Sequence, residues 1–362
     1  MVQKSATDLY LTVGVPPMMR TEDKLNPLSS SPLQEEDIQG VLEVILTAHQ
    51  RLDFETNMEL NMALDLGKDG RFRVNIMRQR QHPALVIRRI TSKIPSFEAL
   101  HLPKLIGKLA LEKRGLILIC GMTSSGKSTV AASMVDYRNS MMGGHILTIE
   151  DPIEFYHEHK MGIVTQREVG IDTASYSVAL KNALRQKPDV ILVGEIRYPD
   201  VMTQAIAVAE TGHMCYATLH TANAAQAIER IINFFPEARH WQTRIALSMN
   251  LRAIIALRLV PSLKEGMVLV PEIMLNEGLI KELILKGDTS RIHDVMASNN
   301  TAGMITFDQS LLNLYKSGTI AEDIAISESE LSSDMKMKIR QIKLSDKTRG
   351  PVLDVDTSGL TL

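Results

Sequence analysis

The chain has 362 residues, a length that suits two domains better than one. Lysine and arginine total 40 against 42 aspartate and glutamate residues, which gives a formal net charge of -2. Proteins that coat nucleic acids carry a cationic surplus and aromatic platforms for stacking bases, and aromatic residues make up only 4% of this chain. We therefore expect no nucleic-acid partner.

Cysteine content and the length of apolar stretches exclude further classes of protein. The two cysteines, Cys120 and Cys215, are too few for a disulfide framework or a four-cysteine zinc site, and both lie in apolar runs typical of buried thiols. Residues 1–11 lack the apolar core of a secretory signal, and no stretch approaches the roughly 20 apolar residues of a membrane span. We expect a soluble, cytoplasmic protein without direct membrane insertion.

The first part of the chain, residues 1–98, predicts a small mixed α/β domain. Its expected elements are a strand at 9–13, a helix at 35–47, hairpin strands at 61–66 and 71–77, and a third strand at 84–90. Two prolines, Pro95 and Pro103, indicate a hinge, with the linker itself at 99–103.

From residue 104 to 270, short apolar strands alternate with helical stretches, a rhythm typical of a parallel sheet covered by helices. The expected strands are 116–120, 146–149, 190–193 and 215–219. Residues 271–330 predict a helical C-terminal region. The polar stretch 331–362 predicts a partly disordered tail.

The strongest motif is a phosphate-binding loop. Residues 121–128 read Gly-Met-Thr-Ser-Ser-Gly-Lys-Ser, which is the pattern of a glycine, four residues and Gly-Lys-Ser, between an apolar strand and a helical stretch. In such a loop Lys127 reaches the β- and γ-phosphates and the Ser128 hydroxyl binds Mg²⁺. The sequence therefore predicts an ATP and Mg²⁺ site. Its expected nucleotide contacts are Gly121, Thr123, Ser124, Ser125, Gly126, Lys127, Ser128 and Thr129.

Carboxylates follow two of the later strands. Glu150, Asp151 and Glu154 follow the strand at 146–149, and Glu195 follows the strand at 190–193. Phosphoryl transfer to water needs one acid that orients the water and another that holds the Mg²⁺ shell. Glu195 has the position of the second acid, and spacing alone does not choose the first. The alternative is that these are solvated loop acids or a helix cap beginning near Asp151.

Two histidines, His213 and His220, flank the strand at 215–219. Residue chemistry leaves two interpretations open for them: hydrogen-bonded packing residues or sensors of the γ-phosphate. A histidine metal site is not expected, because His157 and His159 have no third ligand at a suitable spacing.

Arginines cluster in the first domain between residues 71 and 89. In a strand, Arg71 and Arg73 share one face while Phe72 and Val74 share the other, so the arginines are expected to project outward. They form either a solvated sheet face or a source of charge for a neighbouring subunit's triphosphate.

Together these residues resemble the type IV pilus retraction ATPases, PilT and PilU, of the secretion-ATPase superfamily. The resemblance runs from Ala6 to about Ala325. The stretches that carry it are Ala6–Leu11, Arg71–Val74, Gly121–Thr129, Thr148–Phe155, Gln166–Gly170, Asp189–Arg197, Ala209–His213 and Ala217–His220.

The resemblance implies a PAS-like N-terminal α/β domain joined to a RecA-like P-loop ATPase domain with C-terminal helices. It implies that Glu154 polarises the attacking water, Glu195 acts with Mg²⁺, and His213 and His220 lie near the nucleotide. It further implies that Arg73 and Arg88 act in trans on a neighbour's ATP. The implied assembly is a homohexamer that powers pilus retraction and twitching motility on an inner-membrane platform protein of the PilC type.

Three features favour PilU over PilT: the segments 179–186 and 231–236, the residues Gly278–Ile284 in place of the PilT retraction signature, and the longer tail. A PilU-like protein is expected to act with a PilT-type partner ATPase. Ser124 stands where the family usually has glycine, and serine tolerates a positive φ less well. This leaves an alternative, a nucleotide-binding accessory subunit with little catalysis of its own. A DNA- or protein-secretion motor of the same superfamily is a third hypothesis.

Overall fold

The computed structural model describes residues 1–4, 6–21, 24–67, 70–90, 93–264, 266–298 and 303–348. The chain forms two compact units. The first comprises Met1–Ile94 with the short segments Pro152–Glu158 and Gly170–Asp172, and the second comprises the remainder.

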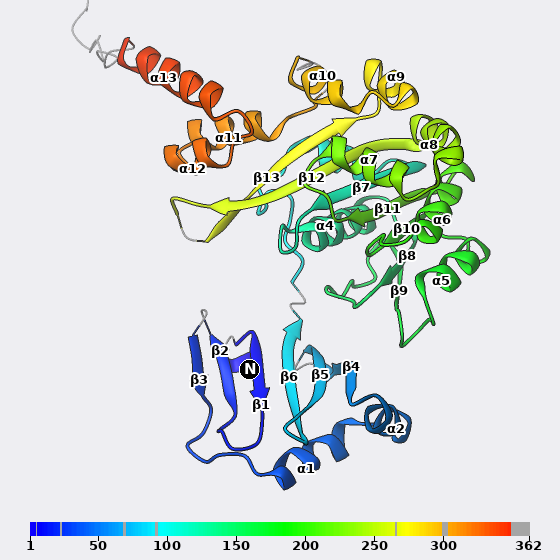
Figure 1. Ribbon diagram of the computed structural model, residues 1–362, viewed down its shortest axis with the longest axis vertical. Coiled ribbons are helices and arrows are strands. Elements are labelled where there is room, and N and C mark those ends of the chain that lie inside the picture. The colour runs from blue at the N-terminus through cyan, green and yellow to red at the C-terminus, as the bar shows by residue number, and fades with distance from the viewer. Residues whose placement is uncertain are drawn as a thin grey trace, which may run out of the picture. The chain divides into compact units, whose positions relative to one another are not determined.

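The first unit is an antiparallel sheet with two helices (Figure 1). Its strands are β1 (Asp8–Leu11), β2 (Met18–Thr21), β3 (Lys24–Pro27), β4 (Glu59–Asp65), β5 (Arg71–Gln79) and β6 (His82–Ile90), in the order β3-β2-β1-β6-β5-β4. The helices α1 (Glu35–Ile45) and α2 (Ala48–Asn57) bury Ile38, Leu42 and Phe54 against the strand residues Val74 and Ile76. The β2–β3 hairpin and α2 are additions to the elements expected from the sequence.

The second unit is built on a seven-stranded sheet in the order β13-β12-β7-β11-β10-β8-β9. Its strands are β7 (Gly115–Gly121), β8 (Gly144–Glu150), β9 (Gly162–Glu168), β10 (Val190–Val193), β11 (Met214–Leu219), β12 (Leu251–Pro261) and β13 (Met267–Leu275). All pairings are parallel except β12 with β13. Every residue of β7, β10 and β11 is buried, as expected for central strands.

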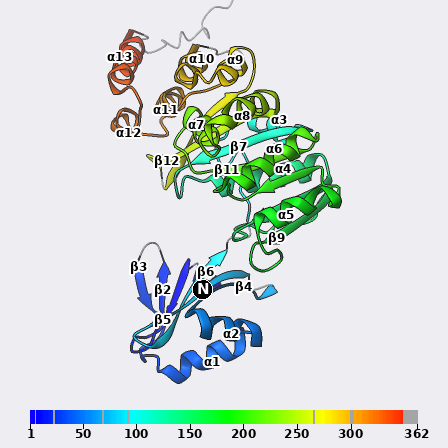
Figure 2. The same cartoon turned by 45° about the vertical axis from the view of Figure 1, so that its right-hand side comes forward.

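Helices surround this sheet (Figure 2). They are α3 (Lys104–Ala110), α4 (Lys127–Met141), α5 (Tyr176–Ala183), α6 (Pro199–Glu210), α7 (Ala224–Asn233) and α8 (Glu237–Asn250). The C-terminal helices are α9 (Leu279–Lys286), α10 (Ile292–Ser298), α11 (Phe307–Lys316), α12 (Glu322–Ser327) and α13 (Ser332–Thr348). Both α4 and α6 pack on β7 and β11, and α7 and α8 pack on β12. The mixed α/β class and two-domain architecture expected from the sequence are confirmed.

Three local differences from the sequence expectations stand out. Residues 271–275, expected in a helical region, complete strand β13. In the expected tail, residues 332–348 form helix α13, and residues 349–362 lie outside the described residues. The segment around the expected linker 99–103 packs into the second unit, because the Phe97 ring lies 4.9 Å from that of Tyr137 and the Ser133 hydroxyl donates to the Pro95 carbonyl at 2.8 Å. Among the described residues, no helix is long and apolar enough to cross a membrane.

Candidate nucleotide-binding site

The phosphate-binding loop connects β7 to α4 at the carboxyl edge of the parallel sheet. Two of its glycines are required by close packing. A β-carbon on Gly121 would lie 2.1 Å from Ser125 Oγ and 2.8 Å from the Leu257 carbonyl oxygen. Gly126 has φ +92°, and its β-carbon would lie 2.9 Å from Leu269 Cδ2. The loop therefore has the tight curvature that lets backbone amides approach a phosphate.

The polar groups of this loop suit an anion. The Lys127 ammonium donates to the carbonyl oxygens of Gly121 and Met122 at 2.8 and 2.7 Å, which folds its side chain back over the loop. The Ser125 hydroxyl is buried and has no hydrogen-bond partner among the described residues. No acidic residue lies in the first turn of α4, so the positive end of this 15-residue helix is available to phosphate.

Ser124 adopts φ +62°, in the left-handed region that favours glycine. The sequence identified Ser124 as a departure from the glycine usual at this position, and the structure shows that the backbone there keeps the glycine-like conformation. The serine β-carbon is therefore accommodated at a local conformational cost.

The carboxyl ends of four parallel strands meet at this edge. The loop follows β7, Glu150 ends β8, Glu195 follows β10, and His220 follows β11. Glu150 is held by its neighbours, since it accepts hydrogen bonds from the Thr148 hydroxyl at 2.6 Å and from the Gln166 amide at 3.2 Å. Ligands collect at such an edge in open parallel sheets, so the structure brings Glu195 and His220 to the edge that holds the loop.

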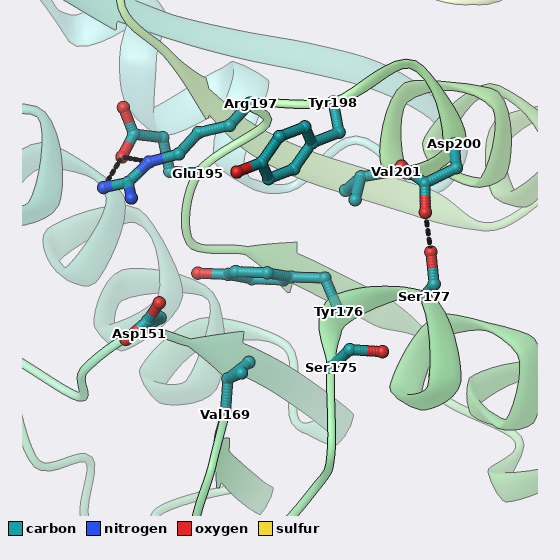
Figure 3. A pocket seen from close by; sticks show the side chains of 10 residues that line it. All are labelled: Asp151, Val169, Ser175, Tyr176, Ser177, Glu195, Arg197, Tyr198, Asp200 and Val201. Atoms are coloured by element: carbon teal, nitrogen blue, oxygen red, sulfur yellow. Dashed lines mark hydrogen bonds and ion pairs between the residues drawn. The ribbon is translucent and has the colours of Figure 1, made fainter. Parts of the chain in front are cut away.

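The Glu195 carboxylate is engaged by Arg197, whose Nη2 lies 2.6 Å from Glu195 Oε2. Glu195 and Arg197 line a cavity of about 270 Å³ at the carboxyl edge of the sheet. The side chains of Tyr176 and Tyr198 lie on facing sides of that cavity (Figure 3). Burial and the nearby charge of Asp151 raise the pKa of Tyr176, which is therefore a neutral phenol. Arg197 and this cavity were not singled out from the sequence, because only the fold brings them next to Glu195.

His213 lies elsewhere. It precedes β11 whereas His220 follows it, so the two side chains lie at opposite edges of the sheet. His213 lines a different cavity with Lys113, Lys187 and Asp189. A six-residue strand spans roughly 20 Å, so the two histidines are well separated within one chain, and the approach of His213 to a nucleotide stays a prediction.

Glu154, Arg73 and Arg88 belong to the first unit. Glu154 is exposed in the segment Pro152–Glu158, which also places Tyr156 under the Arg71 guanidinium, 5.7 Å from the ring centroid. Arg73 and Arg88 are directly opposite each other on β5 and β6.

The two arginines differ in their partners. Arg88 donates to the buried Asp8 carboxylate at 2.8 Å, whereas Arg73 is exposed and makes no ion pair among the described residues. Their action in trans stays a prediction.

The loop requires glycine at two positions and lies between a buried strand and a helix, at the carboxyl edge of a parallel sheet. These features define a P-loop nucleotide-binding protein. Comparison with known proteins gives the family. Residues 40–302 match the family model described as "Type II/IV secretion system protein". The type IV pilus ATPase PilU of Pseudomonas aeruginosa is 46% identical over 100% of this chain and 94% of its own length.

A second relative and a solved structure support the same family. The P. aeruginosa retraction ATPase PilT is 37% identical over 91% of this chain and 96% of its own length. The crystal structure of the pilus retraction motor PilT with bound ADP aligns with a TM-score of 0.87 at 38% identity, covering 93% of this chain and 96% of that one. The chain therefore belongs to the type II/IV secretion system protein family, in its PilT/PilU group of type IV pilus ATPases.

Proposed function

We propose that this chain is a Mg²⁺-dependent ATP hydrolase that works as a PilU-like motor of type IV pilus retraction. It would act as a homohexamer, with a PilT-type ATPase and a PilC-type platform protein at the inner membrane. The observation that carries the proposal is the phosphate-binding loop, with Ser125 Oγ buried and unsatisfied inside a turn that admits no β-carbon at Gly121.

Different residues of the loop and its surroundings would bind the phosphates and the Mg²⁺ ion. The amides at the start of α4 would bind the phosphates, and Lys127 would exchange its two carbonyl contacts for phosphate oxygens. Ser128 and Glu195 would hold Mg²⁺, and their hydroxyl and carboxylate oxygens are the donors that this ion prefers. When bound, the ion would supply positive charge to the transferred phosphoryl group.

The remaining assignments are also part of the proposal. Glu154 would orient the attacking water, and His220 would contact the γ-phosphate from the end of β11. Arg73 and Arg88 would supply positive charge to a neighbouring subunit's ATP, a contribution worth about 10³- to 10⁵-fold in rate where such arginines have been tested.

The test is phosphate release by the purified full chain. Lys127→Ala and Glu154→Gln are each expected to lower ATP turnover by about 100-fold or more. Glu158→Gln is the matched control for the second change, because it makes the same substitution at an exposed position of the same segment. Turnover that survives both active-site changes would overturn the proposal.

Ser124 and the 46% identity to PilU favour one alternative, a nucleotide-binding accessory subunit that supports a PilT-type ring with little turnover of its own. Cells that carry Glu154→Gln distinguish the two roles. Retraction at the wild-type level in those cells, together with its loss in a deletion strain, would establish the accessory role.

A further inference from the structure

Strand β13 carries a buried carboxylate. Glu272 is 2% exposed, and it lies in a run that is otherwise apolar, Val268–Leu275. Burial raises its pKa to about 7, because removing a carboxylate from water penalises the charged form. An apolar residue at this place would avoid that penalty, so the acid is expected to serve a purpose beyond packing.

Its hydrogen bond to the start of α7 identifies that purpose. Glu272 Oε1 accepts from the backbone N–H of Ala224 at 2.9 Å, and Ala224 is the first residue of α7. The helix is otherwise capped locally, since the Asn223 side chain accepts from the Gln226 N–H at 2.9 Å. A carboxylate at this point is favoured by the positive end of the helix, and a charge-assisted bond is roughly twice as strong as a neutral one.

The segment held in this way is the connection between β11 and α7, residues 220–223, which begins with His220. One end of the connection is set by β11, a fully buried strand in the middle of the sheet. The other end is set by the bond from Ala224 to Glu272. The position of His220 therefore depends on both anchors.

Glu272 is also aligned across the sheet with the end of β7, which leads into the phosphate-binding loop. The strand register aligns Glu272 with Ala256 on β12 and Cys120 on β7, and Cys120 directly precedes Gly121. Burial raises the pKa of the Cys120 thiol to about 12, and the charge of Glu272 adds to this rise.

On the other side, Glu272 faces three charged or titratable groups. Arg258 and His293 stabilise its ionised form and Glu330 opposes it. Arg258 pairs with Glu330 at 3.1 Å, and its guanidinium lies 3.9 Å from the Phe307 ring centroid. The acid is therefore enclosed between the nucleotide-binding edge and the C-terminal helices.

We propose that Glu272 is a positioning residue of the nucleotide site: its carboxylate fixes the first turn of α7 and, through it, the loop that presents His220 to the γ-phosphate. This inference rests on the proposed ATPase function. Glu272 touches no reacting atom and acts through His220. Glu272 fixes the position of the loop at the cost of burying a charge, a compromise typical of functional sites.

The test compares Glu272→Ala, which removes the acceptor, with Glu272→Gln, which keeps an oxygen at this place but removes the charge. Glu282→Gln is the control, because Glu282 is an exposed carboxylate on α9 whose side chain is 63% accessible. Two quantities are measured: steady-state ATP turnover from pH 6 to 9, and hydrogen exchange of a peptide that spans residues 219–226.

Glu272→Ala is expected to lower kcat by about 10- to 100-fold with a smaller change in KM, since misplacement by about 1 Å costs up to ~100-fold. Exchange in the 219–226 peptide should accelerate. In the wild type, kcat is expected to rise as Glu272 ionises near pH 7. Glu272→Gln is expected to keep most of the protection from hydrogen exchange and to lose this rise, because glutamine carries no charge. Wild-type kcat and exchange in Glu272→Ala would overturn the inference.

If Glu272→Ala does not fold, Glu272→Gln decides the question: a pH profile that matches the wild type would overturn the inference, and a flattened profile would support it. Absence of turnover in the wild type would contradict the proposed function instead. In that case exchange of the 219–226 peptide, measured with and without a non-hydrolysable ATP analogue, still tests whether Glu272 holds the loop.

Discussion

A β-carbon at position 126 is expected to impair nucleotide binding more than it impairs folding. Gly126 has φ +92°, and an alanine there would place its β-carbon 2.9 Å from Leu269 Cδ2 in a side chain that is only 5% exposed. The left-handed conformation costs an L-residue about 1–2 kcal/mol, and the overlap in a packed core adds about 1 kcal/mol. The loop can relieve this strain of about 2–3 kcal/mol by opening, which corresponds to ~30- to 150-fold weaker ATP binding.

The assay is titration of the full chain with a fluorescent ATP analogue in the presence of Mg²⁺. Gly318→Ala is the matched control, because Gly318 has φ +66° with no atom within 4 Å of the added β-carbon. It should lower stability by about 1 kcal/mol and leave the affinity for the analogue unchanged. An affinity of Gly126→Ala within threefold of the wild type would refute the reasoning about the loop.

Three further predictions follow from local geometry. Ser124→Gly removes a β-carbon at φ +62° and should raise the free energy of unfolding by up to ~1 kcal/mol, because the strain relieved is partly offset by unfolded-chain entropy; chemical denaturation showing a loss would contradict this. Arg88→Ala leaves the buried Asp8 carboxylate without its ion-pair partner and should destabilise the chain by about 1–3 kcal/mol, whereas Arg73→Ala should change stability by less than ~0.5 kcal/mol; equal effects in denaturation curves would count against the assignment. The folded-state pKa of Glu272, about 7, lies above its ordinary value of 4.5, so protonation of Glu272 stabilises the folded state and this contribution is lost as pH rises from about 4.5 through 7. Relative to Glu272→Gln, the wild type should therefore lose up to ~3 kcal/mol of unfolding free energy between pH 5 and 8. Parallel curves of unfolding free energy against pH for the two proteins would argue against a buried acid.

The sequence predicted the loop and strands at the carboxyl edge of the parallel sheet well, because the sequence signals for these elements are local. The loop 121–128 needs glycines and a lysine at fixed spacing, and the four strands that end at this edge are short apolar runs, all of which the structure shows as parallel strands. Since parallel strands end at a common edge, the position of Glu195 near the loop followed from chain order alone.

Elements with weak or ambiguous periodicity were missed. The edge strand β9 reads Gly-Ile-Val-Thr-Gln-Arg-Glu and is half-exposed, and helix α2 buries only Phe54. The apolar run of β13 does not distinguish strand from helix, which also hid the significance of Glu272.

His213 shows a different limit of sequence reasoning. Adjacency in the chain suggested a pair with His220, and the extension of β11 separates the two residues in space.

The central claim is that the loop at 121–128 binds the triphosphate and that hydrolysis needs a separate acid. Calorimetric titration of Glu154→Gln with MgATP tests it most directly, with the double variant Lys127→Ala, Glu154→Gln as comparison. The account predicts tight binding without turnover in the first protein and binding weakened at least ~10-fold in the second. Equal affinity in both proteins would contradict it.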